Sequence, residues 1–177
     1  HMTNGCYNIT VSECVVNNGG DDGISVVSYL TNPTICRNIN IVGNHVNGGS
    51  ARGITVVGGK DITITGNTIK DKNNAGIYLS SEASYNTYEV NNVVVSNNVI
   101  RHCGTMTSDN PGSFKIAGRD GYPVSSVICR GNVIMDCGGD GVLITGSVPS
   151  ANSDIIFAEN QIEAAAATVR GQGIKLI

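Results

Sequence analysis

The chain repeats one pattern six times along its 177 residues, and this repeat constrains the fold more than any other feature. The third repeat reads DITITGNTIKDKNNAGIYL: an apolar-x-apolar segment, a turn ending in Asn, a second short apolar segment, a polar loop, then Gly-apolar-x-apolar. The six repeats begin at Asn8, Asn38, Asp61, Asn92, Ser126 and Asp154. These starts are 30, 23, 31, 34 and 28 residues apart, so we take 23 residues as the bare coil and the remainder as inserted loops.

The apolar positions of the repeats align into five columns. Alternation with period two puts both columns of the first segment on one face of a strand. One of these columns contains Val11, Ile41, Ile64, Val95, Cys129 and Phe157. No single repeat can bury such faces alone, so the repeats must stack. We predict an all-β right-handed parallel β-helix, a solenoid of about six coils, with right-handed connections between its parallel strands.

A column of asparagines marks one turn of the repeat. Its members are Asn44, Asn67, Asn98, Asn132 and Asn160, with Cys14 at that position in the first repeat. Asn tolerates the left-handed backbone conformation of a tight turn, so we expect it there. Stacked amides can also bond along the solenoid axis, which predicts a structural ladder rather than a catalytic role.

Charge and hydropathy exclude two classes of partner. The chain carries 11 Lys and Arg against 14 Asp and Glu, a net charge of −3, whereas a general nucleic-acid binder normally has a basic stripe. No run of about 18 apolar residues is present, so no segment is expected to span a membrane.

The two ends of the chain differ from the repeat. His1-Met2 looks like a cloning scar, which leaves residues 3–177 as a single domain. We see no polar cap at either end and expect a fragment of a longer protein. Uncapped coil ends also predict association into a homo-oligomer. Residues 163–170, EAAAATVR, are expected to form a small helical excursion.

The repeat resembles the pectin-lyase-like β-helix superfamily over nearly the whole chain. Residues 19–26, GGDDGISV, resemble the Gly-Asp-Asp-Cys-Ile-Ser-Ile segment of polygalacturonase-type glycosidases. Residues 50–59, SARGITVVGG, resemble their Gly-His-Gly-Ile-Ser-Ile-Gly-Ser segment, with Arg52 at the position of the His. Phage tailspike depolymerases match equally well. The resemblance implies a polysaccharide or oligosaccharide partner and an extracellular, secreted or virion-surface location.

Asp21 and Asp22 are the candidate catalytic residues, because glycoside hydrolysis needs a proton-donating acid and a second carboxylate. The alternative is that Asp-Asp-Gly is only a turn. Asp140 occupies the same column as Asp22 but lies four coils away, about 19 Å at the usual strand spacing. That distance exceeds the roughly 6.5–9.5 Å between the carboxyl groups of inverting glycosidases, so we interpret Asp140 as a turn residue.

Four residues are candidates for substrate binding. Arg52 lies one coil from Asp22, and the pair either holds a sugar carboxylate or forms a surface salt bridge of little energetic value. Tyr78 is placed to stack on a sugar ring and Lys115 to meet an acidic sugar. Glu82 lies in one of the loops that follow the Gly-apolar strands. We expect these loops to stack into one wall, and a second insertion at residues 104–113 to form another, with a groove between them.

Metal ligands and disulfides are not expected. The three His residues share no ligand spacing and the six Cys form no Cys-x-x-Cys pair, so we predict no metal and no cofactor. A Ca²⁺ ion held by Asp21, Asp22 and backbone oxygens is the alternative. Cys103 and Cys137 should stack at about 4.8 Å, too far for the roughly 3.8 Å between the Cβ atoms of a disulfide. We therefore predict reduced thiols, with Cys129 buried.

Taken together, these features favour a carbohydrate-active β-helix, either a polysaccharide hydrolase or a depolymerase of the glycosidase or tailspike type. The alternative is non-catalytic: a β-helix stalk, an adhesin or a polysaccharide-binding segment.

Overall fold

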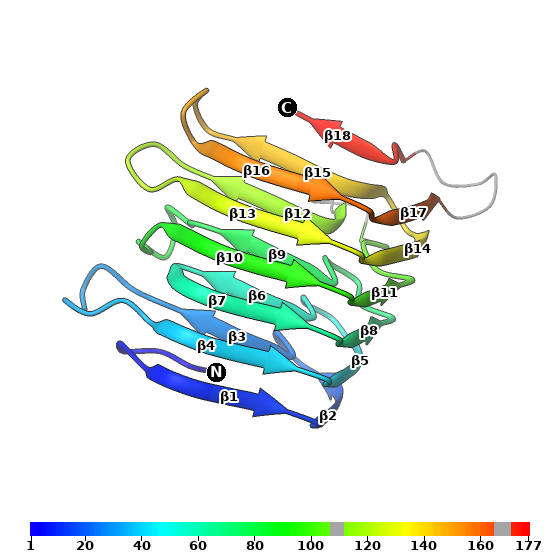
Figure 1. The fold of residues 1–177 in the computed structure, drawn as a ribbon, viewed down its shortest axis with the longest axis horizontal. Coiled ribbons are helices and arrows are strands. Elements are labelled where there is room, and N and C mark those ends of the chain that lie inside the picture. Colours follow the sequence, from blue (N-terminus) through cyan, green and yellow to red (C-terminus); the bar gives the residue numbers. More distant parts are fainter. Residues whose placement is uncertain (107–111, 165–170) are drawn as a thin grey trace.

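A computed structural model describes residues 1–106, 112–164 and 171–177. It is an all-β parallel solenoid in which each coil contributes one strand to each of three six-stranded sheets (Figure 1). The first sheet contains β1 (Tyr7–Ser12), β4 (Arg37–Val42), β7 (Gly59–Thr65), β10 (Val90–Ser96), β13 (Val124–Arg130) and β16 (Asn152–Ala158). The second contains β2 (Val15–Gly19), β5 (His45–Gly49), β8 (Thr68–Lys70), β11 (Val99–Arg101), β14 (Val133–Cys137) and β17 (Gln161–Ala164). The third contains β3 (Ile24–Val27), β6 (Ile54–Val57), β9 (Ile77–Ser80), β12 (Gly112–Gly118), β15 (Asp140–Gly146) and β18 (Ile174–Leu176).

The predicted apolar columns are confirmed as the core. Coil one consists of β1–β3 and coil six of β16–β18, and every strand pair between neighbouring coils is parallel. In the first sheet, the register pairs Val11 with Ile41, Ile41 with Ile64, Ile64 with Val95, Val95 with Cys129 and Cys129 with Phe157. The inner members of this column are completely buried, whereas Leu176 on the outermost strand of the third sheet is 72% exposed. Within the described residues, no helix is long and apolar enough to cross a membrane.

The asparagine ladder is also confirmed. Asn98 donates from its backbone N–H and from Nδ2 to Oδ1 of Asn132, at 3.0 and 2.9 Å, and from Nδ2 to the carbonyl of Ile64 at 2.9 Å. The same amide-to-amide contacts join Asn44 to Asn67 and Asn67 to Asn98. Each amide therefore satisfies buried backbone groups of the coils beside it.

The prediction that the ladder Asn itself adopts the left-handed conformation of the turn was wrong. The residues with positive φ are those immediately before the ladder: Glu13, Gly43, Gly66, Asn97, Gly131 and Glu159. The left-handed residue turns the chain, and the following Asn then points inward, where its side chain is buried. A second left-handed column opens the repeats themselves, at Asn8, Asn38, Asp61, Asn92, Ser126 and Asp154.

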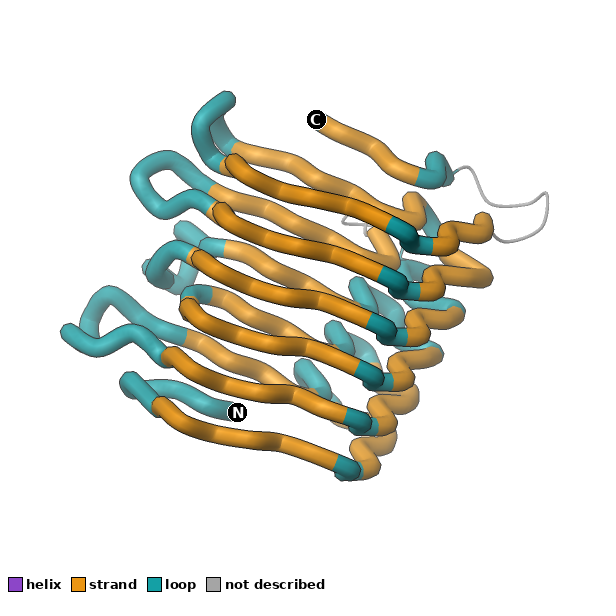
Figure 2. The backbone as a smooth tube through the Cα atoms, in the orientation of Figure 1, coloured by secondary structure: helices purple, strands orange, loops and turns teal. Residues whose placement is uncertain are grey.

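The loops that follow the third sheet stack into one wall, as predicted, and project from the same side of the solenoid (Figure 2). The loops of coils one and three pair directly, because the Leu30 N–H donates to the Asn86 carbonyl at 2.8 Å and the Tyr88 N–H to the Ser28 carbonyl at 3.0 Å. The loop of coil four joins them through a bond from the Arg119 N–H to Ser81 Oγ at 3.1 Å. Coil two has no inserted loop, so the loops of coils one and three contact each other across it.

Two expected loop features lie partly or wholly outside the described residues. Of the second insertion, residues 107–111 are not described. Of the expected helical excursion at residues 163–170, the first two residues belong to β17 and the others are not described.

The six cysteine thiols are free. Cys103 and Cys137 lie in adjacent coils, two residues beyond the paired positions of Arg101 and Met135, and both are buried. Burial raises the pKa of the Cys103 and Cys129 thiols to about 12, so both are protonated at neutral pH.

Candidate functional site

A pocket opens on the outer face of the third sheet at coils one to three, beside the loop wall. Val27 and Val57, from β3 and β6, contribute its apolar surface. Its polar and aromatic lining consists of Asp21, Asp22, Arg52, Glu82, Tyr29 and Tyr85, with His1 also in contact. Four of these six residues, Asp21, Asp22, Arg52 and Glu82, were predicted from the sequence, and the structure brings them together.

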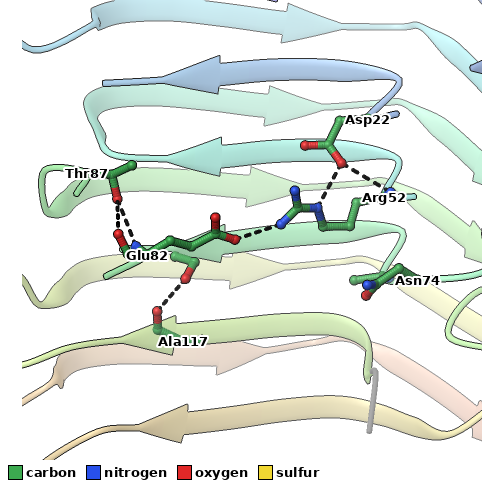
Figure 3. Close-up of polar contacts among 8 residues, drawn as sticks. Asp22, Arg52, Asn74, Glu82, Thr87 and Ala117 are labelled. Carbon is green, nitrogen blue, oxygen red and sulfur yellow. Dashed lines mark hydrogen bonds and ion pairs between the residues drawn. The ribbon is translucent and has the colours of Figure 1, made fainter. Parts of the chain in front are cut away.

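Arg52 is the centre of the polar lining (Figure 3). Its Nε lies 2.8 Å from Oδ1 of Asp22, and its Nη1 lies 2.8 Å from Oε1 of Glu82. The Arg52 backbone N–H also donates to the same Asp22 oxygen, at 3.2 Å. The predicted pair of Asp22 and Arg52 is thus confirmed, and Glu82 extends it to a triplet that spans coils one, two and three.

The repeat explains how these side chains meet. Asp22 and Arg52 each lie two residues before the first residue of a third-sheet strand, so they occupy equivalent positions in successive coils. Glu82 comes from the wall loop that follows β9. Thr87 fixes that loop, because its Oγ1 accepts a hydrogen bond from the Glu82 N–H at 2.8 Å (Figure 3). The segments that lead directly into two strands and one anchored loop therefore fix the triplet.

The triplet is largely shielded from solvent. The side chains of Arg52, Asp22 and Glu82 are 21%, 9% and 16% exposed. Burial alone would lower the pKa of Arg52, but the hydrogen bond and charge of Asp22, together with Glu82, outweigh it and raise the pKa. Arg52 is therefore permanently charged, and two of its guanidinium nitrogens are bound to carboxylates.

The ring of Tyr78 packs against the guanidinium group of Arg52. The guanidinium carbon of Arg52 lies 4.7 Å from the centroid of the Tyr78 ring, and Tyr78 is only 9% exposed. Burial, with the charge of Glu82 as a smaller contribution, raises the pKa of Tyr78 to about 12. This ring is covered by Arg52, whereas Tyr29 and Tyr85 line the pocket itself. Lys115 is the register partner of Tyr78 on β12, with Nζ 5.9 Å from the same ring, and it does not line the pocket.

The two pocket tyrosines were not predicted from the sequence. Tyr29 and Tyr85 lie in the wall loops of coils one and three, and Tyr85 is 63% exposed. Both occur in insertions that were expected to form the wall, so aromatic residues within those insertions were the available signal. Their convergence depends on the pairing of the two loops, which no periodic pattern specifies.

Asp140 occupies the position in coil five that Asp22 occupies in coil one, so it shows the structural role of an aspartate there. Its Oδ1 accepts a hydrogen bond from the Gln172 N–H at 2.8 Å, as Asp22 does from Arg52, and its Oδ2 lies 3.8 Å from Lys175 Nζ. An Asp before the Gly-apolar strand thus bonds a backbone N–H of the next coil and faces a cation there. Asp22 has this structural role as well as its place in the pocket.

Asp21 differs from Asp22. It lines the same pocket, it is exposed, and it forms no ion pair within the described residues. It is therefore the one pocket carboxylate whose charge is not met by Arg52.

Candidate metal donors do not gather anywhere in the described residues: no group of three or more His, Cys, Asp and Glu side chains could hold an ion. His45 begins β5, two coils from His102, whose Nδ1 lies 2.8 Å from Oδ1 of Asp71. The buried thiols with raised pKa are poor ligands, because a metal binds the thiolate.

A comparison with protein families assigns the first four coils to a known family. Residues 2–118 match the model of the periplasmic copper-binding protein NosD. The chain belongs to the NosD family. The match includes every residue of the pocket lining except His1 and ends with β12, whereas β13–β18 continue the same repeat beyond it. Comparisons with curated proteins and with solved structures found no significant match. The resemblance to polygalacturonases and tailspikes is not confirmed.

Proposed function

We propose that this NosD-family chain is a non-catalytic carbohydrate-binding β-helix whose ligand lies in the pocket around Arg52. The observation that carries the proposal is the ion triplet: Arg52 holds Asp22 and Glu82 in fixed positions beside two pocket tyrosines. Such an arrangement presents a preorganised polar surface and costs little reorganisation when a ligand binds.

The pocket provides contacts for both surfaces of a sugar ring, the apolar face and the hydroxyl groups. Tyr29 and Tyr85 supply flat rings for the apolar face of a sugar, and Val27 and Val57 extend that apolar surface. Carboxylate oxygens of Asp21, Asp22 and Glu82 accept hydrogen bonds from hydroxyl groups, and bonds to charged groups are the stronger ones. The rigid solenoid positions these loop residues, which is a common arrangement for binding sites.

A hydrolase remains the second candidate, favoured by the GGDDGISV segment that contains Asp21 and Asp22. The geometry favours binding over catalysis. The Asp22 oxygen that faces Arg52 already accepts two hydrogen bonds from it, and Asp140 reproduces the backbone bond in coil five. Glycoside hydrolysis instead needs one carboxyl group able to donate a proton and a second one free to act as base or nucleophile.

Copper binding, which the family description names, is not part of this proposal. Imidazole and thiolate are ligands that suit copper, and in the described part of the chain no group of three or more His, Cys, Asp and Glu side chains is placed to hold an ion. The description does agree with a location outside the cytoplasm, which we propose for this chain as well.

The test is a panel of neutral and acidic oligosaccharides and polysaccharides, assayed in parallel for binding by calorimetry and for release of reducing ends. We expect binding without release. Release that Asp22→Asn lowers by about a hundredfold, the usual scale for general acid–base catalysis, would establish the hydrolase instead. No binding to any member of the panel would remove the carbohydrate proposal.

A further inference from the structure

Building on the proposed function, we propose that the pocket selects uncharged sugars and rejects uronic acids. The selectivity arises from the charges that line the pocket. Three carboxylates, from Asp21, Asp22 and Glu82, face one guanidinium, from Arg52. Among the charged groups that line the pocket, negative ones outnumber positive ones even if the amino group of His1 is counted.

The guanidinium is already committed to protein carboxylates. Its Nε and Nη1 are bound to Asp22 and Glu82 at 2.8 Å each, and the side chain is only 21% exposed. A sugar carboxylate that replaced either partner would leave that partner's charge shielded from water without its cation. The idea that Arg52 holds a sugar carboxylate therefore conflicts with the geometry.

The next cation, Lys72, interacts through its charge with Asp22 and Asp21 but does not reach a ligand in the pocket. Lys72 lies in the third coil, but it is only 1% exposed and does not line the pocket. Its Nζ donates to the Gly48 carbonyl at 2.7 Å. Its side chain, from the segment between β8 and β9, is buried and does not face a ligand, so it offers no hydrogen bond to an acidic sugar.

Asp21 makes the rejection stronger. It is the pocket carboxylate outside the triplet, so its negative charge acts directly on whatever enters. Like charges that are brought together in a partly desolvated site oppose binding. A neutral sugar avoids this repulsion and still offers hydroxyl groups to the same oxygens.

The experiment uses matched ligand pairs that share one backbone: methyl-esterified and free oligogalacturonides, and cello-oligosaccharides and their C6-oxidised forms. Affinities are measured by calorimetry at physiological salt. For every pair in which either member binds, we expect the uncharged form to bind at least tenfold more tightly. Tighter binding of the acidic form would overturn the selectivity while the carbohydrate proposal stands. No binding in any arm would contradict both.

A pair of variants separates the pocket charge from the net charge. Asp21→Asn removes the carboxylate outside the triplet and should reduce discrimination against the acidic forms at least threefold. Asp154→Asn makes the same charge change at an exposed position where three other coils carry Asn, and should leave discrimination unchanged. Equal effects of the two variants would show that the net charge of the protein, and not the pocket, sets the preference.

Discussion

Arg52 joins three successive coils through one side chain. It contacts Asp22 of coil one and Glu82 of coil three, and it covers Tyr78. Removing one member of a shielded ion pair costs more than the pair itself contributes, because the remaining charges lose their partner and are still screened from water.

The first prediction concerns this residue. Arg52→Met should lower the free energy of unfolding by roughly 3 kcal/mol, because two shielded carboxylates lose their cation. The control is Arg130→Met, which removes an exposed arginine 3.7 Å from Glu159 and should change stability by less than about 1 kcal/mol. Urea unfolding measures both. Equal losses in the two variants would mean that the triplet contributes no more than a surface pair.

The sequence predicted one side of the triplet and not the other. Asp22 and Arg52 occupy equivalent positions in adjacent coils, so the repeat alone places them together. Glu82 was assigned to the wall, but its contact with Arg52 depends on how the loop of coil three folds. That path is set by Thr87 and by pairing with the loop of coil one, which are interactions outside the repeat.

At the scale of the elements, the columns were predictable because period-two alternation is a local property of a strand. The amide ladder was predictable as a repeated residue, but the left-handed conformation was assigned one position too late. A repeated Asn is compatible with both roles, the turn and the ladder. Only the dihedral angles show that Gly43, Gly66 and their equivalents form the turn.

The second prediction tests the ladder. Asn98→Ala removes a completely buried amide that bonds both neighbouring coils and should cost about 3 kcal/mol, since buried backbone groups lose their partners. Asn47→Ala, in which the lost amide contact is a long, exposed one of 3.4 Å, should cost less than about 1 kcal/mol. Chemical denaturation distinguishes them. A small effect of Asn98→Ala would show that the ladder is dispensable.

The third prediction tests the paired loops above coil two. Gly58 has a φ of +78°, and an added Cβ would lie 2.9 Å from the Ser28 carbonyl oxygen and 3.1 Å from the Tyr88 backbone. Gly58→Ala should cost about 2–3 kcal/mol and loosen the pocket wall. Gly121 has a φ of +72° with nothing within 4 Å of the added atom, so Gly121→Ala should cost only about 1–2 kcal/mol. Similar melting temperatures for the two variants would contradict the close packing of the loops.

At the scale of the whole molecule, apolar side chains are exposed on the outermost coils. Val15 on coil one is 66% exposed and Leu176 on coil six is 72% exposed, and both lie on outer strands of their sheets. Outer strands present unpaired backbone groups that favour association. The fourth prediction is therefore concentration-dependent association in sedimentation velocity, which Leu176→Lys should weaken. A single monomeric species at all concentrations in the unsubstituted protein would exclude association through these ends.

The solenoid matters to function as the support for one pocket. The wall loops, the ion triplet and the two pocket tyrosines all depend on coils one to three remaining in register. The central claim is that a carbohydrate binds there and not elsewhere on the repetitive surface.

Substitution of two exposed tyrosines tests this claim most directly. Tyr85 lines the pocket and is 63% exposed, whereas Tyr7 is 58% exposed on β1 and does not line the pocket. The affinity of each variant for the tightest-binding oligosaccharide of the panel is measured by calorimetry. We expect Tyr85→Ala to weaken binding at least tenfold and Tyr7→Ala to leave it unchanged. Unchanged affinity in Tyr85→Ala, or an equal loss in both variants, would contradict a carbohydrate site at this pocket.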